Sequence, residues 1–434
     1  MTIRKTSAKK NASRKTLRRR ATQRNTPVVQ PSRESLSSIK ANMDRATNLV
    51  TKLLVIPGKS GEEAEVAAFI RGELCRAGVP MANLRTDSAQ RRTLLAGDTG
   101  NLICKLPGTI RRPRRLLMAH MDTVPICLDS QPVRQGNWVR SGHPDRGIGA
   151  DDRAGVAVVL FAALEILRQK IPHPPLTFCW TIQEEIGLHG ARCLNHQLLG
   201  RPRLAFNWDG GASDKLTIGA TSGYRMEIRV YGLASHAGGA PEMGVSAVSI
   251  ASIAIADLVA KGWHGDIQKG RKKGTSNVGY FCGGEATNVV TDYVELKAEA
   301  RSHDQVFLRR IVREIEQAFR RAVTKVTNVM GDRGRVEFSG RLDYEAFCLP
   351  ADDPSLLVAE KAIRTLGKTP VRAIANGGLD ANWMTQRGIP TVTMGCGQVN
   401  QHMVSEALDL TNFQDACRIA LCLAANCEES YGSG

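Results

Sequence analysis

Short apolar runs alternate with longer apolar stretches over much of the chain, and the short runs end in polar residues. The four clearest runs cover residues 116–119, 176–182, 204–208 and 390–394. Between the first two, residues 152–170 form an apolar stretch long enough for a crossover helix. Strands that alternate with helices predict a doubly wound, mostly parallel α/β sheet, and such sheets bind ligands beyond the carboxyl ends of their strands.

The chain between residues 218 and 345 follows a different pattern. It predicts strands and helices in the order βαββαβ, at 222–232, 242–261, 276–283, 293–301, 304–325 and 335–343. The second helix places apolar residues on one face, as an amphipathic helix with one buried side does; they are Phe307, Leu308, Ile311, Val312, Ile315 and Phe319. This order is that of the ferredoxin-like unit.

The alternation of strands and helices returns after Leu349. The ferredoxin-like unit is therefore predicted to be a lid or dimerisation domain at 218–347, inserted between catalytic segments at 37–217 and 348–434. The first catalytic segment should begin with helices over 37–77, broken at Pro57 and Gly58. Ser60 is placed to cap the second of these helices, with Glu62 and Glu63 in its first turn.

Residues 1–36 are predicted to be a disordered basic tail. Eleven lysines and arginines and no acid lie in residues 1–33, so the rest of the chain has a surplus of six basic residues out of the formal net charge of +17. The tail lacks apolar periodicity, which is typical of disorder. A solvated leader, a polyanion-binding arm and an organelle transit peptide all fit this composition, so nucleic acid is a possible partner only through the tail.

Cysteine usage and hydropathy bear on the compartment. The eleven cysteines are scattered without CxxC pairs, which argues against a disulfide framework and favours a reducing compartment, most simply the cytoplasm. The longest apolar runs fall short of the roughly 20 residues that a membrane-spanning helix needs, so no membrane span is expected.

Candidate catalytic residues follow the predicted strands. His120 and Asp122 lie two positions apart in an extended segment, where their side chains share one side, so the carboxylate could orient an imidazole that binds zinc. Asp151, in the sequence GADDRAG, places a carboxylate in a glycine-bearing turn that leads into a helix. Taken alone, these patterns also suit an ordinary histidine or a helix cap.

Two further strand ends carry acids. Glu184 and Glu185 follow a predicted strand, and adjacent carboxylates at a buried edge need a compensating charge such as that of a metal. One of the pair could bind the metal while the other stays free as a general base. Asp209 repeats the carboxylate at a strand end, and His402 supplies a second imidazole from the far end of the chain.

Two imidazoles and three carboxylates are nitrogen and oxygen ligands that suit zinc, with cobalt or manganese as substitutes. A bridging carboxylate between them favours a pair of metals about 3.5–4 Å apart that share a hydroxide. The sequence therefore predicts a hydrolytic site.

Eight motifs occur in a fixed order along the chain: HMDTVP, GADDRAG, QEEIGLHGA, WDGG, GLASHAG, NVVTD, NGGLDAN and HMVSE. Together they resemble the co-catalytic zinc metallopeptidases that include peptidase T, aminoacylase and the glutamate-releasing carboxypeptidases. The resemblance covers residues 37 to 434, and GADDRAG and WDGG favour the peptidase T branch. It implies two zinc ions per chain, with His120 and Asp209 on one, Glu185 and His402 on the other, and Asp151 as the bridge.

The same resemblance implies roles for other residues. Glu184 becomes the general base, Asp122 orients His120, and His236 in the lid helps to hold the oxyanion, often across a homodimer formed by two lids. The residues implied in contacts with substrate or in lining the cleft are Asn288, Arg301, Gly377, Gly378 and Asp380. Arg153 departs from the family, which usually has lysine there.

The predicted function is a zinc-dependent peptidase in which metal-bound hydroxide attacks the amide of a short peptide, with an aminopeptidase of the peptidase T type as the leading interpretation. An acyl-amino-acid deacylase or a carboxypeptidase with the same metal site is the alternative. A remote alternative is a non-catalytic polyanion-binding protein acting through its tail. That reading would be favoured by loss of a ligand or of the base, and every one of these residues is present.

Overall fold

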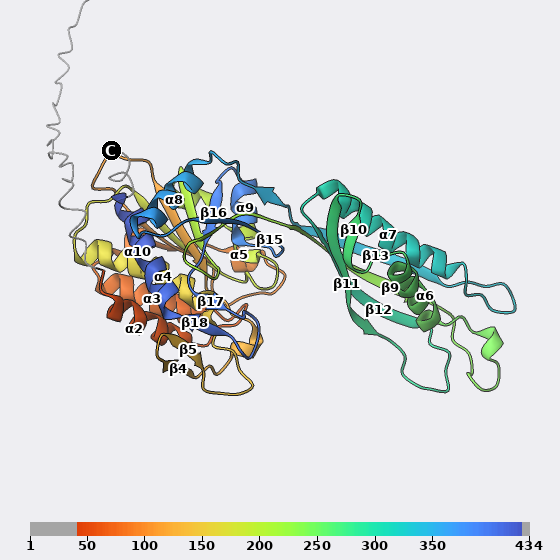
Figure 1. Ribbon diagram of the computed structural model, residues 1–434. Helices are drawn as coiled ribbons and strands as arrows, with labels where there is room; N and C mark the ends of the chain where they lie inside the picture. Colours follow the sequence, from red (N-terminus) through yellow and green to blue (C-terminus); the bar gives the residue numbers. More distant parts are fainter. Residues whose placement is uncertain (1–40, 428–434) are drawn as a thin grey trace, which may run out of the picture.

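The computed structural model describes residues 41–427 and consists of two units (Figure 1). The catalytic unit contains a nine-stranded sheet with helices on both faces, and the lid is a separate five-stranded sheet with two helices. The chain enters the lid after β8 (Lys215–Ala220) and returns to the catalytic unit at β14 (Phe347–Cys348). The predicted basic tail at 1–36 lies outside the described residues.

The large sheet is mixed and has a parallel centre. Strands β6, β3, β7 and β16 are mutually parallel neighbours in that order, and antiparallel pairs flank them on both sides. Its strands are β1 (Leu84–Thr86), β2 (Leu102–Leu106), β3 (Arg115–His120), β6 (Leu176–Thr181), β7 (Leu204–Trp208), β8, β14, β15 (Val371–Ala375) and β16 (Thr391–Met394). The predicted doubly wound α/β class is thereby confirmed, and the four expected strands match β3, β6, β7 and β16.

Alternating side chains of the central strands pack into two separate apolar layers. In β3, Leu117 and Ala119 join the main core, whereas Leu116 and Met118 join a smaller core on the other face. The main core contains α2 (Met43–Leu54), α3 (Ala64–Arg76), α4 (Ala150–Arg168), α8 (Pro354–Thr365) and α10 (Leu410–Ala425). The smaller core is closed by Met384 of α9 (Asp380–Gln386) and by Leu194 and Leu199, which follow α5 (His189–Cys193).

Helix α4 is the predicted crossover, and it is buried along nearly its whole length because sheet and helices surround it. A small four-stranded sheet lies beside its start, built from β4 (Pro132–Gln135), β5 (Trp138–Ser141), β17 (Gln398–Val399) and β18 (Ala407–Asp409). None of the helices within 41–427 has the length and apolarity needed to cross a membrane.

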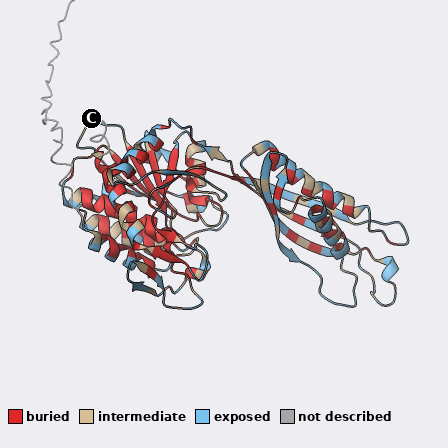
Figure 2. Cartoon of the chain, in the orientation of Figure 1, coloured by how far each residue is buried: buried red, intermediate tan, exposed pale blue. Residues whose placement is uncertain are grey.

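The lid has the ferredoxin-like strand order with one additional edge strand. It contains β9 (Ser222–Tyr231), α6 (Ala247–Ala260), β10 (Gly265–Lys269), β11 (Lys272–Cys282), β12 (Tyr293–Ser302), α7 (Gln305–Val323) and β13 (Arg335–Tyr344), and the sheet order is β10-β11-β12-β9-β13. Helices α6 and α7 cover one face, and the opposite face has mostly exposed or half-buried positions (Figure 2).

Three local predictions need correction. Strand β10 was missed because its sequence, Gly-Asp-Ile-Gln-Lys, is short and polar, although it pairs with β11 in a tight hairpin. Helix α6 begins at Ala247 rather than 242, since Ser246 caps it by accepting a hydrogen bond from the Ser249 amide. Ser60 does not cap α3, which starts four residues later; its hydroxyl donates instead to the Asp122 carboxylate at 2.6 Å.

Candidate metal centre

The candidate ligands lie at one edge of the parallel strands. His120 is the last residue of β3, Asp209 directly follows β7, and Glu185 comes four residues after β6 ends. Asp151 lies at the first turn of α4, after Gly149, whose backbone is in the left-handed region with φ of 71°. Carboxyl ends of parallel strands meet at one edge, so the topology gathers residues far apart in the chain.

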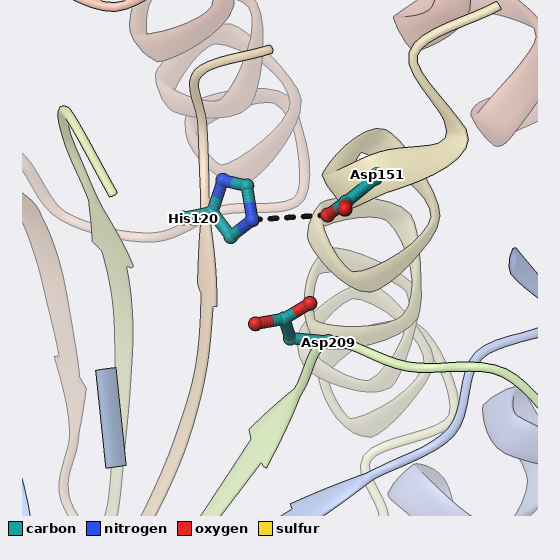
Figure 3. Close-up of side chains that lie close together, drawn as sticks. All are labelled: His120, Asp151 and Asp209. Atoms are coloured by element: carbon teal, nitrogen blue, oxygen red, sulfur yellow. Dashed lines mark hydrogen bonds and ion pairs between the residues drawn. The ribbon is translucent and has the colours of Figure 1, made fainter. Parts of the chain in front are cut away.

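The five predicted ligands form two groups that share Asp151. His120, Asp151 and Asp209 make one group, and Asp151, Glu185 and His402 make the other, with ligand atoms within 4.8 Å of one another in each. The two oxygens of Asp151 point to different groups. Oδ1 lies 3.1 Å from His120 Nε2, and Oδ2 lies 3.5 Å from His402 Nε2 (Figure 3 shows the first group). Asp151 is thus placed where a bridging ligand would stand.

The charge of the site fits cations. Burial and neighbouring carboxylates raise the pKa of Asp209 to about 8 and that of Glu185 to about 7. The two carboxylates beside His402, at 2.9 Å for Glu185 and 3.5 Å for Asp151, raise the imidazole pKa to about 10. A cluster of partly buried acids that repel one another is stabilised by bound positive charge, and oxygen and imidazole nitrogen are ligands that divalent zinc, cobalt and manganese accept.

Asp122 connects the two strand ends. Its backbone carbonyl lies 3.1 Å from His120 Nδ1 and one of its carboxylate oxygens lies 3.4 Å from the same nitrogen, so Nε2 is the ring nitrogen that faces the metal site. The same carboxylate accepts hydrogen bonds from the backbone amides of Glu184 at 2.9 Å and Glu185 at 3.2 Å, and from the Ser60 hydroxyl. Asp122 therefore fixes a ligand of each group at once.

The Glu184 carboxyl is buried beside these ligands, and burial together with the nearby acids raises its pKa well above the usual range. A carboxyl with a raised pKa is suited to take and return a proton near neutral pH. Asp380, at the start of α9, is also buried here, and it accepts a hydrogen bond from the Thr181 hydroxyl. Burial raises the pKa of Asp380 to about 6.

Glu406 holds the loop that carries Asp151, a role that sequence reasoning did not assign. One carboxylate oxygen accepts from the amides of Ile148 at 3.0 Å and Gly149 at 2.7 Å, and the other accepts from the Asp151 amide at 3.0 Å. The Cys127 thiol also donates to Glu406, at 3.3 Å. The sequence showed only that Glu406 is an acid four residues after His402, and nothing in it indicated which groups the carboxylate would contact.

Asp152 has a structural role beside the bridging residue. Its carboxylate accepts from the His120 amide at 3.1 Å, the Gly155 amide at 3.0 Å and the Gln398 side chain at 2.7 Å. The two adjacent acids of GADDRAG thus have different roles. Asp151 faces the ligand groups, whereas Asp152 holds the backbone of β3 and α4. Arg153, also buried, donates to the backbone carbonyls of Ile56 and Gly58, at 3.2 and 3.3 Å.

Two of the expected lid residues lie far from the ligands. β9 starts beside the catalytic unit and ends at Tyr231, and ten residues of strand span roughly 33 Å. His236 follows that far end and is exposed. It forms an isolated β-bridge with Val289, and the backbone amide of the next residue, Ala237, donates to the Asn288 carbonyl at 2.9 Å. The structure brings His236 and Asn288 together and keeps both away from the metal centre of their own chain.

The remaining predicted contacts lie near the junction of the two units. Arg301 pairs with Glu299 through two hydrogen bonds, of 2.9 and 3.0 Å, at the end of β12 close to the catalytic unit. Gly378 leaves room for the Tyr344 ring, since a Cβ there would lie 2.4 Å from it. Gly377 and Gly378 precede α9, at whose start Asp380 lies.

Comparison with known proteins decides the family. The model of peptidase family M20/M25/M40 matches residues 116–426. The chain belongs to this family. M20 members are peptidases, so the chain is a hydrolase that acts on peptide bonds, and the resemblance seen in the eight motifs is confirmed.

Individual M20 relatives span nearly the whole described chain. A tripeptidase from Staphylococcus aureus subsp. aureus Mu50 superposes with a TM-score of 0.79 at 28% identity, covering 90% of this chain and 99% of that one. The aminopeptidase PepT from Bacillus cereus ATCC 10987 gives 0.75 at 29% identity, with the same coverage. Carboxypeptidase G2 from Pseudomonas sp. strain RS-16 is 29% identical over 354 residues, which is 79% of each chain.

Proposed function

We propose that this M20 peptidase is a two-zinc enzyme that removes residues from the amino-terminal end of short peptides. The observation that carries the proposal is the pair of ligand groups joined by Asp151, with the buried Glu184 carboxyl beside them. His120 and Asp209 would hold one zinc and Glu185 and His402 the other, with Asp151 between them. Two such cations lower the pKa of water and polarise the amide carbonyl.

The protein's own groups account for the proton movements. Glu184 takes a proton from the attacking water and passes it to the nitrogen of the leaving amine, for which its raised pKa is suited. Asp122 keeps His120 in the orientation that presents Nε2, and it also holds the backbone at Glu184 and Glu185. Glu406 holds Asp151 by accepting a hydrogen bond from its backbone amide.

His236 is the proposed donor to the oxyanion. Its Nδ1 accepts hydrogen bonds from the amides of Gly238 at 3.1 Å and Gly239 at 3.0 Å, so the proton of a neutral ring sits on Nε2 and can be donated. Because the strand that leads to His236 spans roughly 33 Å, we propose that it serves the metal centre of a second chain in a homodimer formed through the lids.

The choice of substrate rests on the relatives. Their names, a tripeptidase and an aminopeptidase, favour amino-terminal cleavage of short peptides. The similarity to carboxypeptidase G2 favours a second candidate, carboxy-terminal cleavage with the same ligands.

A mass-spectrometric assay separates the two candidates. Zinc-loaded protein is given tripeptides with one isotopically labelled terminal residue, and N-acetylated amino acids in parallel. Release of the amino-terminal residue from free tripeptides supports the proposal. Release of only the carboxy-terminal residue, or hydrolysis of only the acetylated compounds, would replace it with the second candidate or with a deacylase.

A further inference from the structure

A pocket of about 490 Å³ opens beside the metal centre. Its wall comes from four segments that are distant in sequence and is lined by Lys59, Ser60, Gly61, Glu62, Leu95, Ala96, Pro125 and Ile186. A volume of this size lies within the usual range for small-ligand sites. None of these residues is among the predicted ligands or catalytic groups.

The pocket is joined to the catalytic residues by short connections. Ile186 directly follows the ligand Glu185, and the Ser60 hydroxyl donates to Asp122 at 2.6 Å. The side-chain amide of Gln183, the residue before Glu184, donates to the Leu95 carbonyl at 3.0 Å. The wall of the pocket is therefore fixed to the segment that holds both Glu184 and the ligand Glu185.

The chemistry of the wall is apolar beside a site that is otherwise rich in carboxylates. Leu95 is 47% exposed, and Ala96 and Pro125 are also exposed. The charged members, Lys59 and Glu62, form an ion pair at 2.9 Å with each other. Exposed apolar surface in a concave site next to catalytic groups is what an apolar ligand covers, with the release of water as the driving force.

We infer that this pocket binds an apolar side chain of the substrate residue next to the cleaved bond, and that Leu95 determines this specificity. The inference rests on the proposed peptidase function and adds a preference among peptides. The side chain could come from the residue on either side of the bond, and the two arms of the experiment below distinguish these sources. Covering a leucine-sized side chain favours its binding by about 10-fold or more over glycine.

The test uses the zinc-loaded full chain and two peptide series. In the first arm the amino-terminal residue of X-Gly-Gly is leucine, serine or glycine, and in the second arm the middle residue of Gly-X-Gly is varied in the same way. The value measured is the ratio of kcat/KM for leucine to that for serine in each arm. Leu95→Asp is compared with Leu94→Asp, because Leu94 is the neighbouring leucine, is 69% exposed and is not part of the pocket wall.

We expect the unaltered protein to prefer leucine to serine by about 10-fold in one arm, and Leu95→Asp to lose most of that preference while Leu94→Asp keeps it. Equal kcat/KM for leucine and serine in both arms would overturn the inference, as would an equal loss in the two variants. If no peptide of either series is hydrolysed by the unaltered protein, the proposed function itself has failed, which is a different outcome from hydrolysis without selectivity.

Discussion

The metal centre and the tip of the lid, defined as residues 232–245 and 283–292, differ in how their functional side chains are held. At the metal centre Asp122 alone joins His120 to the backbone of Glu184 and Glu185, and Glu406 fixes Asp151 through backbone amides. At the lid tip, His236 is exposed and its ring is held by two amides of its own loop. The two candidate ligand groups thus lie within one chain, whereas His236 would need a second chain or a large movement to act as the proposed donor to the oxyanion.

The largest expected effect comes from the proposed base at the metal centre, Glu184. Glu184→Gln keeps the size of the side chain but cannot accept the proton, so turnover should fall about 100-fold to 10,000-fold while the metal content stays the same. Peptide hydrolysis and metal analysis on the same sample check this. Glu65→Gln, on the exposed side of α3, is the control and should keep full activity. Near-normal turnover of Glu184→Gln with its metals bound would remove the base assignment.

At the lid tip, His236→Ala should reduce kcat by about 100-fold to 1,000-fold, because the proposed donor to the oxyanion is lost. If His236 serves a second chain, a mixture of His236→Ala and Glu184→Gln chains should regain part of the activity, since one of its mixed sites contains both intact groups. Sedimentation of the active protein measures the dimer independently. A fully active monomer would contradict a site shared between chains. A dimer whose mixed chains regain no activity would indicate that His236 acts on the metal centre of its own chain.

Metal binding should strengthen as the pH rises. Without metal, Asp209, Glu185 and His402 have raised pKa values of about 8, 7 and 10, so each holds a proton below its own value. A metal must displace those protons, and therefore its affinity should increase with pH. Displacement of one proton alone gives about 100-fold between pH 6 and 8. Competition with a chelator at several pH values measures this affinity. An affinity that does not change with pH would show that Asp209, Glu185 and His402 are already deprotonated in the metal-free protein.

A smaller effect on metal affinity is expected from Glu406, which holds the loop of the ligand Asp151. In Glu406→Gln one of the two accepting oxygens becomes an amide nitrogen, which cannot accept from the backbone amides that hold Asp151. Metal affinity should fall about 10-fold to 100-fold at both positions, as it does when an outer hydrogen bond of a ligand is lost. Cys127→Ala, which removes only the thiol donor to Glu406, should have less effect. Equal metal affinity in Glu406→Gln and the unaltered protein would show that the loop carrying Asp151 keeps its conformation without the Glu406 carboxylate.

The sequence predicted the parts of this molecule that follow from periodicity and strand ends. His120, Asp209 and the Glu184-Glu185 pair follow short apolar runs, and parallel strands bring such positions to one edge. Most of the hydrogen bonds that Glu406 and Asp152 accept come from backbone amides, which carry no residue-specific signal in the sequence. Strand β10 was too short and polar to be recognised.

The distance between His236 and the metal centre was equally beyond sequence reasoning. It depends on the length of β9 and on the side from which the chain enters the lid, and a motif such as GLASHAG reports neither. The pocket beside Leu95 was missed for a related reason, because its four wall segments come together only in the folded chain.

The central claim is that Asp151 serves both metal positions, and metal analysis of Asp151→Ala tests it most directly. The unaltered protein should bind close to two zinc ions per chain, and Asp145→Ala, which alters an exposed aspartate, should do the same. Asp151→Ala should lose tight binding at both positions, because each ligand group loses the residue that they share. Two tightly held zinc ions in Asp151→Ala would contradict the claim and would assign the bridge to another group.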